Sequence, residues 1–494
     1  MNHILAIDQG TSGTKAVIFD AEGGIAAAAT AELASSFPRP GFVEQDPRAI
    51  LGSVIEAVGA CTARFRDAGG DPRDIITCGI SNQRETFLLW DARGTPLCNA
   101  VSWQCERSVA ICERLRAEGQ SAEVAARTGL IIAPYFSGTK LLWLMENDPA
   151  VRAAVRAGAA RFGTVDAWLL QSLTRDGAFA TDHTNASRTL LFNIDSLTWD
   201  DHLLKTWGLA DLILPPAYPS QHPYGETDFD GALPRPVPID AMIGDSHAAA
   251  FGEGCISAGS AKATMGTGSS VLMNVGGKRC LSHGGMVATI CWSLPGRVQY
   301  ALEGIIISCG ATIAWLRDQL GLFAASADTE EIARAVQDSG GVFLVPAFSG
   351  LGSPHWRMSL KASIVGLSFA TGRNHIVRAA LESIPFQIAD VIASMETDTG
   401  LRPTALRVDG GMTSNGFVVQ FLADLLGIPV VSMGIAEASA FGAAAIAGLG
   451  AGVYSGLEEL AGLPRSETWF RVGPDSGQAK KRHEEWKRIL STIL

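Results

Sequence analysis

The stretch that most constrains the fold lies near the N-terminus, where two apolar runs of strand length flank a short polar turn. Residues 4–7 and 16–19 are apolar, and the segment between them holds two glycines, three hydroxyl side chains and Lys15. This pattern predicts a strand, a tight turn and a second strand. A glycine-rich turn points backbone N–H groups outward and hydroxyls add donors, so the turn is a candidate nest for phosphate oxygens. An ordinary polar hairpin would show the same pattern.

The turn differs from the two commonest nucleotide loops. The chain contains no GxxxxGK[ST] motif, and no GxGxxG opens a helix after a strand. These absences argue against a Walker loop and a dinucleotide fingerprint. Asp8 ends the first strand beside the turn, where a carboxylate can hold a metal ion or its waters or can cap the turn.

Length and composition limit the classes of protein to which the chain can belong. At 494 residues the chain exceeds one ordinary core, so we expect two large domains. With 47% hydrophobic and 18% charged residues, the composition is typical of a globular chain. The net charge is −11 and no run of Lys or Arg occurs, which argues against a nucleic-acid partner.

The cysteines and the apolar segments bear on the compartment. Nine cysteines are scattered without a CxxC pair, so we expect neither a disulfide framework nor a zinc site, and a reduced, cytoplasmic location. No charged leader precedes an apolar core, so we expect no signal peptide. The most apolar segment, 431–450, is interrupted by Glu437, and we expect no membrane span.

A cluster of polar side chains separates two apolar strands predicted over 75–81 and 87–90. Arg84 can donate in a rigid fork and Glu85 can accept from hydroxyls, so the cluster is a candidate ligand site facing a cleft. The alternative is a solvated turn. Further on, Tyr135 lies between two predicted helices and is a candidate aromatic wall, although simple loop packing is the commoner explanation.

Residues 211–238 carry seven prolines, the clearest shift of composition in the chain. Because proline fixes φ and lacks a donor, we predict a mostly extended segment that links domains or wraps the surface. A strand over 237–243 follows and stops at Gly244, and a helix of small residues then begins at Asp245. A carboxylate at this position points into the crevice of an α/β sheet. On the residues alone, a helix N-cap also explains Asp245.

The second half repeats the opening pattern at residues 261–273, again as strand, glycine-hydroxyl turn and strand. Two such nests would grip the phosphates of a nucleotide from both sides, and the repeat favours a duplicated two-domain architecture. We predict a helix over 304–320, in which Gly310 permits close approach of a ligand. Residues 406–415 predict strand, glycine turn and helix start, an arrangement suited to a phosphate or ribose.

Together and in this order, these segments closely resemble the glycerol kinase branch of the FGGY carbohydrate kinases. The resemblance covers about residues 5–445, nearly the whole chain. The matching stretches include AIDQGTSGTKAVIFD, ISNQRET, VSWQCER, TDHTNASRTLLFNI, GDSHAAAFG, TMGTGSSVLMN and RVDGGMTSNGF. Each stretch alone is a weak signal, whereas the whole series in register is specific.

The resemblance implies an α/β fold of two ribonuclease-H-like (actin-like ATPase) domains that flank a deep cleft. The first, at residues 1–248, would carry the polyol acceptor site and the phosphate loop, and the second, at residues 249–494, the nucleotide site. It also implies transfer of the γ-phosphoryl group of ATP, with Mg²⁺, to a primary hydroxyl of a small polyol, with glycerol as the first candidate acceptor and sn-glycerol 3-phosphate as the product. The runner-up is a kinase for a larger polyol or a ketopentose, similar to xylulokinases. A distant alternative is an actin-like ATPase without a metabolic substrate. We also expect a homodimer or a higher homo-oligomer.

The resemblance assigns roles residue by residue. It makes Asp245 the general base and places Asp8 in the Mg²⁺ shell. The implied acceptor site comprises Arg84, Glu85, Trp103, Tyr135, Asp245, Ser246 and Ser270. The implied nucleotide site comprises Thr11, Ser12, Lys15, Thr267, Gly268, Gly310, Gly411 and Asn415.

The chain departs from the family pattern at three positions. Lys15 stands where these kinases often have Arg, so its contact would be a point charge rather than a fork. Ser246 and Ser270 stand where glycerol kinases have Gln and Phe. A buried aromatic side chain covers roughly 150–250 Å², so either other side chains refill the space or the acceptor is larger and more polar than glycerol.

Overall fold

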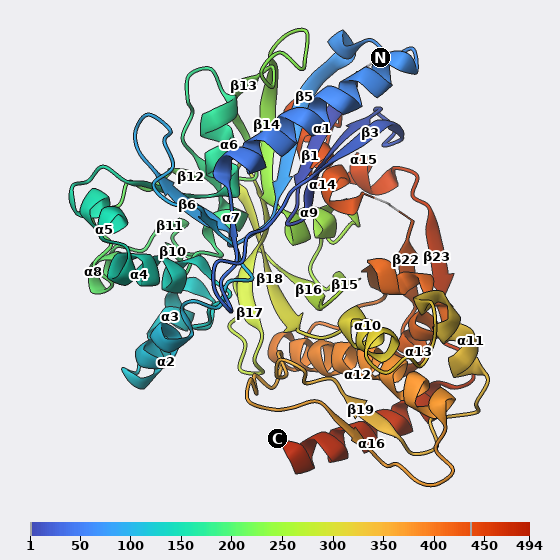
Figure 1. The fold of residues 1–494 in the computed structure, drawn as a ribbon. Coiled ribbons are helices and arrows are strands. Elements are labelled where there is room, and N and C mark those ends of the chain that lie inside the picture. The colour runs from blue at the N-terminus through green and yellow to red at the C-terminus, as the bar shows by residue number, and fades with distance from the viewer. Residues whose placement is uncertain (1, 435–436) are drawn as a thin grey trace. The chain divides into compact units, whose positions relative to one another are not determined.

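The computed structural model describes residues 2–434 and 437–494, and the chain divides into two α/β units, each built on its own central sheet (Figure 1). The first unit comprises Met1–Gly254, Thr289–Tyr300 and Glu437–Pro464. The second unit comprises Cys255–Ala288, Ala301–Ala436 and Arg465–Leu494. The predicted α/β class is confirmed. A single cut after residue 248 does not reproduce this division, because segments 289–300 and 437–464 pack with the first unit.

The central sheet of the first unit has the strand order β13-β14-β5-β1-β2-β3. Its strands are β1 (His3–Gln9), β2 (Gly13–Phe19), β3 (Ile25–Glu32), β5 (Ile75–Asn82), β13 (Gln221–Thr227) and β14 (Val237–Gly244). β1 and β2 form the predicted antiparallel hairpin, while β1, β5 and β14 run parallel to one another.

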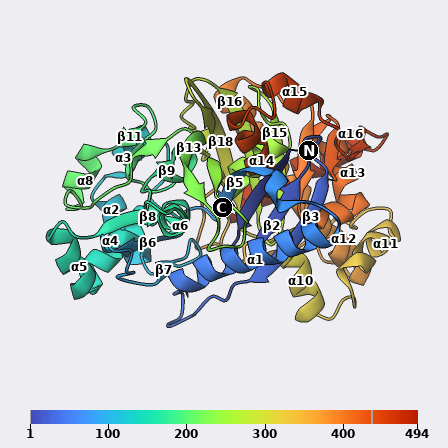
Figure 2. The same cartoon turned by 90° about the horizontal axis from the view of Figure 1, so that it is seen from above.

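Helices cover both faces of this sheet because successive side chains of each strand point to opposite faces. On one face, Leu5 and Ile7 share a core with α1 (Pro47–Asp67) and α6 (Val165–Leu173), and Figure 2 shows α1 lying along β2 and β3. On the other face lie α9 (Asp245–Gly252) and α14 (Ala438–Gly450).

Small residues let α14 approach this second face closely. A Cβ atom on Gly79 would lie 2.2 Å from the carbonyl oxygen of Ala443, and one on Gly442 would lie 1.8 Å from that of Ala248. Both distances are far below van der Waals contact, so glycine is required at both positions. This packing explains why the alanine- and glycine-rich segment near the C-terminus belongs to the first unit.

The rest of the first unit consists of short strands and helices. A second sheet has the order β4-β7-β6-β8, and β9-β12 and β10-β11 form two-stranded pairs. These strands are β4 (Glu44–Gln45), β6 (Phe87–Trp90), β7 (Ala100–Val101), β8 (Arg161–Thr164), β9 (Thr181–Asp182), β10 (Phe192–Asn193), β11 (Thr198–Trp199) and β12 (Ala217–Tyr218). The remaining helices are η1 (Pro72–Asp74), α2 (Val109–Ala117), α3 (Ser121–Thr128), α4 (Ser137–Asn147), α5 (Pro149–Arg156), α7 (His183–Ala186), α8 (Asp201–Thr206) and α15 (Leu457–Gly462). Asp46 caps the start of α1 by accepting from the Arg48 N–H, and Pro47 is the first residue of the helix.

A seven-stranded sheet has the order β17-β18-β16-β15-β21-β22-β23, and all of it except residues 289–300 of β17 and β18 belongs to the second unit. Its strands are β15 (Ala261–Met265), β16 (Ser269–Gly276), β17 (Val287–Leu294), β18 (Arg297–Ile306), β21 (Leu406–Asp409), β22 (Val430–Met433) and β23 (Glu467–Phe470), and β19 (Phe343–Val345) pairs with β20 (Ser363–Val365) apart from them. The helices are α10 (Gly310–Asp318), η2 (Ser326–Asp328), α11 (Thr329–Arg334), α12 (Arg373–Thr399), η3 (Gly411–Ser414), α13 (Gly416–Leu426) and α16 (Ser476–Ile493).

The strand order of the second sheet repeats that of the first. An antiparallel hairpin, β15 and β16, lies beside the parallel strands β21 and β22, with β23 antiparallel at the edge. These strands correspond in order and direction to β1, β2, β5, β14 and β13. The repeat that the two glycine-hydroxyl turns predict therefore extends over the core of each unit.

Of the two alternatives for the proline-rich segment 211–238, a linker between domains is excluded, because the segment carries β12 and the edge strand β13 of the first unit. Pro223 is tolerated there because an edge strand can lack a ladder donor. The helix expected from residue 304 begins only at Gly310, since β18 continues to Ile306 and its isoleucines favour a strand. Within residues 2–434 and 437–494, no helix combines the length and the apolar character needed to cross a membrane.

Candidate functional site

The carboxyl ends of three parallel strands meet at one edge of the first unit's sheet. In the strand register, Asp8 of β1 pairs with Ser81 of β5, and Asn82 pairs with Gly244 of β14. Asp245 directly follows Gly244, and Arg84 lies two residues beyond Asn82. This edge is where α/β sheets bind ligands, and the sheet brings Asp8, Arg84 and Asp245 together there.

Arg84 and Asp245 form an ion pair. The Arg84 Nε donates to Asp245 Oδ1 at 3.1 Å, and the same oxygen accepts from the backbone N–H of Ser246 at 2.6 Å. Gly244 rather than Asp245 occupies the N-cap position of α9, so Asp245 is the first helical residue. The Arg84 side chain is 4% exposed while that of Asp245 is 35% exposed, so the carboxylate is oriented by a buried partner yet reaches solvent.

Asp8 lies near a second carboxylate and has few compensating donors. Ser81 Oγ donates to Asp8 Oδ1 at 3.0 Å. Burial, together with the nearby Asp245 carboxylate, raises the pKa of Asp8 from its ordinary value of 3.8 to about 6. A carboxylate with a raised pKa is one that a cation would stabilise. Among the described residues, no group of three or more His, Cys, Asp or Glu side chains could hold a metal ion by itself.

Lys15 stands opposite Asp8 in the β1–β2 register, and its ammonium group is already paired. Its Nζ donates to both carboxylate oxygens of Glu437, at 3.0 and 2.7 Å. The two side chains are 42% and 20% exposed, so solvent screens the pair. A phosphate group that binds Lys15 would have to compete with Glu437.

The first glycine-hydroxyl turn is anchored from outside the hairpin. Trp103 Nε1 donates to Thr11 Oγ1 at 2.9 Å, and Gln45 Nε2 donates to the carbonyl oxygen of Thr11 at 2.7 Å. Ser12 is exposed at the tip of the turn. Trp103, a candidate acceptor contact, therefore also contacts a candidate phosphate-binding residue.

Glu85 is buried and strained. Its side chain is 1% exposed, and its φ of 60° lies in the left-handed region, which non-glycine residues adopt at a cost of about 1–3 kcal/mol. Its Oε1 accepts from Nε of Arg188 at 2.6 Å. The Arg188 guanidinium lies 6.0 Å from the centroid of the Tyr135 ring and is 0% exposed. Sequence reasoning missed Arg188, although a cation inside the motif TDHTNASRTLLFNI was a usable signal.

Lys140 was also missed. Its side chain is fully buried, and its Nζ donates to the carbonyl oxygens of Tyr135 at 2.8 Å and Trp103 at 3.3 Å. The rings of Trp103 and Tyr135 lie 5.5 Å apart in an edge-to-face arrangement. One ammonium group thus holds the two segments that carry these rings. Burial lowers the pKa of Lys140 to about 7.

In the second unit, the turn at 266–268 packs against the start of α10. The carbonyl oxygens of Gly266 and Thr267 accept from the N–H groups of Gly310 and Ala311, at 2.9 and 3.1 Å. A Cβ atom on Gly310 would lie 2.8 Å from the Gly266 oxygen, so this contact requires glycine. The Thr267 side chain is exposed, and Gly268 completes the turn by accepting from the Gly266 N–H.

The other candidates of the second unit have defined structural partners. Asn415 caps α13 by accepting from the Val418 N–H at 3.2 Å, and its amide donates to Thr329 at 3.0 Å. Gly411 begins η3 beside it. Ser270 Oγ donates to Oε1 of the buried Glu303 at 2.8 Å. A nucleotide role for Asn415 would have to coexist with its capping bonds.

The structure thus separates the predicted site residues into two sets. Those in the first unit are Asp8, Thr11, Ser12, Lys15, Arg84, Glu85, Trp103, Tyr135, Asp245 and Ser246. Those in the second unit are Thr267, Gly268, Ser270, Gly310, Gly411 and Asn415.

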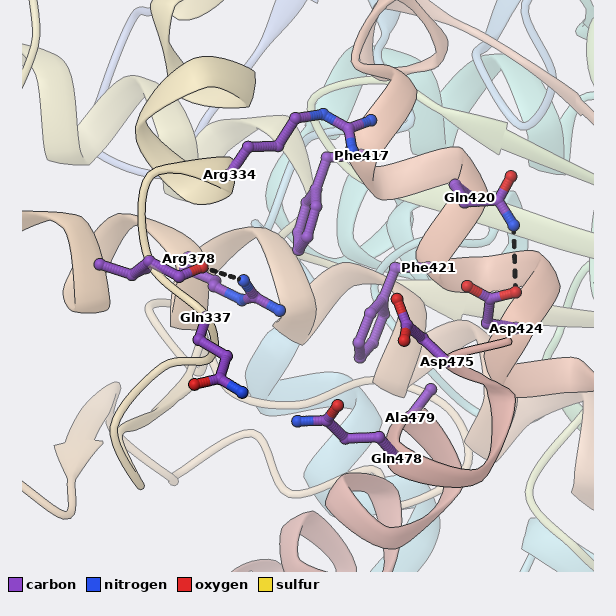
Figure 3. Close-up of a pocket in the computed structure, with 11 residues that line it drawn as sticks. Arg334, Gln337, Arg378, Phe417, Gln420, Phe421, Asp424, Asp475, Gln478 and Ala479 are labelled. Carbon is purple, nitrogen blue, oxygen red and sulfur yellow. Dashed lines mark hydrogen bonds between the residues drawn. The ribbon is translucent and has the colours of Figure 1, made fainter. Parts of the chain in front are cut away.

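A pocket of about 340 Å³ in the second unit contains none of these residues in its described lining (Figure 3). Residues of α11, α12, α13 and α16 line it, among them Phe417 and Phe421. Several of its polar side chains already have partners in the protein. Arg378 donates to Glu382 and to the carbonyl oxygen of Val336, and Gln420 donates to Asp424. The pocket therefore indicates no particular ligand.

Known proteins resemble this chain along its full length. Residues 3–252 match the N-terminal domain of the FGGY family of carbohydrate kinases, and residues 261–451 match its C-terminal domain. The glycerol kinase of Symbiobacterium thermophilum is 44% identical over 489 residues, covering 99% of this chain and 97% of that protein. Glycerol kinase 2 of Thermotoga maritima is 43% identical, covering 100% and 99%. The crystal structure of Plasmodium falciparum glycerol kinase with ADP superposes with a TM-score of 0.93 at 34% identity, covering 100% and 98%.

Proposed function

Because the chain belongs to the FGGY family of carbohydrate kinases, we propose that it transfers the γ-phosphoryl group of ATP to a primary hydroxyl of glycerol, forming sn-glycerol 3-phosphate. The observation that supports this most is identity of 43–44% with glycerol kinases over practically the whole of both chains. The ADP bound in the structure of the Plasmodium relative supports an adenine nucleotide as the phosphoryl donor.

Asp245 is the general base of this proposal. Its carboxylate is partly exposed and is oriented by Arg84. In the reaction, the attacking hydroxyl gives its proton to Asp245 as its oxygen bonds to the γ-phosphorus, and the bond from phosphorus to the bridging oxygen of ADP breaks. Phosphoryl transfer depends mainly on positioning and charge stabilisation, and a positioned base contributes typically 10²–10⁴-fold.

The acceptor is held, in this proposal, by the charged and aromatic side chains beside Asp245. Arg84 and Glu85 supply donors and acceptors for the hydroxyl groups, and Arg188 fixes Glu85 from behind. Trp103 and Tyr135 supply apolar walls for the carbon chain. Ser246 completes the set of the first unit, and Ser270 is the candidate acceptor contact of the second unit. Both side chains are small, which favours an acceptor no smaller than glycerol.

Each unit carries, in this proposal, its own candidate contacts for the nucleotide. Lys15 and the hydroxyls of Thr11 and Ser12 contact phosphate oxygens from the first unit. Lys15 must first exchange its partner Glu437 for a phosphate group. The contributors from the second unit are Thr267, Gly268, Gly310, Gly411 and Asn415.

The chemistry of Asp8 fits a magnesium ion. Its raised pKa shows a carboxylate that lacks a full set of compensating charges. Mg²⁺ is usually bound by one or two carboxylates, with water and substrate phosphates completing its shell. Asp8 would hold the ion directly or through water, and the ion would neutralise charge on the transferring phosphoryl group.

We also propose a cytoplasmic location and a homo-oligomer. Seven of the nine cysteines are buried thiols, which suits a reducing compartment. The oligomeric state stays a prediction, and light scattering of the purified protein measures it.

The test of the proposed function is release of ADP by the purified chain with Mg²⁺ and ATP, with and without glycerol. We expect release that depends on glycerol, with glycerol 3-phosphate as the product. The panel also includes a four-carbon polyol, pentitols and ketopentoses. A clear preference for one of these would show that the acceptor is larger than glycerol. ADP release at the same rate with and without every acceptor would refute the proposal of a polyol kinase.

A further inference from the structure

A buried turn in the first unit connects the ends of the two strands that lead to Arg84 and Asp245. The turn consists of Asp182, at the end of β9, and α7 (His183–Ala186). Asp182, Thr184 and Asn185 are all fully buried. None of them belongs to the site described above.

The Asp182 carboxylate organises this turn. Its Oδ1 accepts from the backbone N–H and the side-chain amide of Asn185, both at 2.8 Å. Its Oδ2 accepts from the backbone N–H of Thr184 at 2.9 Å and from Ser220 Oγ at 2.8 Å. The Thr184 hydroxyl donates to the same carboxylate at 2.8 Å. Five donors converge on this one carboxyl group, so it fixes the side chains of Thr184 and Asn185.

The Thr184 hydroxyl links the Asp182 carboxyl group to the strand that precedes Asp245. Because its hydroxyl proton points at Asp182, a lone pair of the oxygen is free to accept from elsewhere. That oxygen accepts from the backbone N–H of Gly244 at 2.9 Å. Gly244 is the last residue of β14 and is bonded directly to Asp245.

The Asn185 side chain links the Asp182 carboxyl group to the strand that precedes Arg84. Its side-chain amide pairs reciprocally with that of Asn82, at 3.0 Å in one direction and 2.9 Å in the other. Asn82 is the last residue of β5, pairs with Gly244 in the strand register and lies two residues before Arg84. One carboxylate thus anchors both strand ends between which the Arg84–Asp245 ion pair forms.

We propose that Asp182 is a positioning residue for phosphoryl transfer, acting through Thr184 on Asp245 and through Asn185 on Arg84. The proposal rests on the proposed function of Asp245 as the base. A base must lie close to the proton that it accepts, and a displacement of about 1 Å can cost roughly 10²-fold in rate. In this proposal the turn holds Asp245 and Arg84 in position and itself contacts neither the acceptor nor the nucleotide.

The test compares Thr184→Val with Thr184→Ser and with a matched control. Valine keeps the shape of threonine but cannot accept from Gly244, whereas serine keeps the hydroxyl. Thr128→Val is the control, because Thr128 is also fully buried, accepts from the Leu130 N–H at 3.1 Å and donates to a backbone carbonyl. Both valine variants therefore lose a similar pair of hydrogen bonds.

We expect both valine variants to lower Tm, but only Thr184→Val to lower kcat, by about 10-fold or more. The KM for ATP should stay within about twofold, and Thr184→Ser should restore kcat to within about threefold of wild type. A merely structural role would lower Tm without separating kcat from KM. Equal kcat values in the two valine variants would overturn the proposal.

A second readout separates failure of this proposal from failure of the proposed function. If the wild-type chain shows no ADP release that depends on glycerol, the function is wrong, and a crystal structure of Thr184→Val still decides the positioning role. We expect the Arg84 Nε to Asp245 Oδ1 distance, 3.1 Å in the wild type, to lengthen by more than about 0.5 Å, the tolerance of a well-built site. An unchanged distance would refute the positioning role.

Discussion

Replacement of the buried Lys140 by methionine should change how the stability of the protein depends on pH. Lys140 is fully buried, and its pKa is lowered from 10.5 to about 7, with burial as the largest cause. Between these two values the unfolded lysine keeps its proton while the folded one releases it. Because the unfolded state then binds more protons, the free energy of unfolding rises with pH across this range.

The magnitude follows from the two pKa values. Between pH 6 and pH 8.5, linkage gives a gain of about 2 kcal/mol in the free energy of unfolding from this one group. For a unit of this size, that gain corresponds to roughly 4–8 °C in Tm. In Lys140→Met this contribution disappears. The variant also loses hydrogen bonds to the Trp103 and Tyr135 carbonyl oxygens, at about 1 kcal/mol each, but this loss is the same at every pH.

Thermal unfolding of wild type and Lys140→Met, followed by circular dichroism in buffers from pH 6 to pH 8.5, measures the effect. Other titrating groups contribute equally to both proteins, so they cancel in the difference of slopes. Lys205→Met, at an exposed position on α8, is the control and should keep the wild-type slope. If the curves for wild type and Lys140→Met run parallel, the assignment of a strongly lowered pKa to a desolvated Lys140 is refuted.

Three further predictions concern the charged groups of the first unit. Asp245→Asn should lower kcat by about 10²–10⁴-fold and leave the Kd for ATP unchanged by calorimetry; near-normal turnover would remove Asp245 from the mechanism. Glu437→Gln should free Lys15, and because an exposed pair contributes at most about 1 kcal/mol, the KM for ATP should fall up to about fivefold; a higher KM would contradict competition between Glu437 and phosphate. Arg188→Met should destabilise the protein by about 3–5 kcal/mol in urea unfolding, since it leaves Glu85 buried without this partner. In the double variant Glu85→Leu/Arg188→Met we expect stability to recover and activity to stay lost. This result would separate the contribution of the ion pair to stability from the contribution of Glu85 to acceptor binding.

Features set by neighbouring residues could be predicted from the sequence. Two apolar runs around glycines and hydroxyls predict the hairpin of β1 and β2, because strand propensity and turn chemistry act over a few residues. The same holds for the start of α1, where Asp46 and Pro47 form a local cap. The order of motifs indicated the family, and the family match over residues 3–252 and 261–451 confirms it.

What the sequence could not supply are contacts between residues far apart in the chain. The partner of Lys15, Glu437, lies 422 positions away, and the partner of Glu85, Arg188, lies 103 away. Which buried charges meet depends on how whole helices and sheets pack, and that packing is decided by all the side chains together. For the same reason only the tertiary structure placed α14 on the first unit and tied Asp182 to the ends of β5 and β14. Sequence patterns determined the elements and the family, whereas long-range packing decided which side chains orient the candidate catalytic groups.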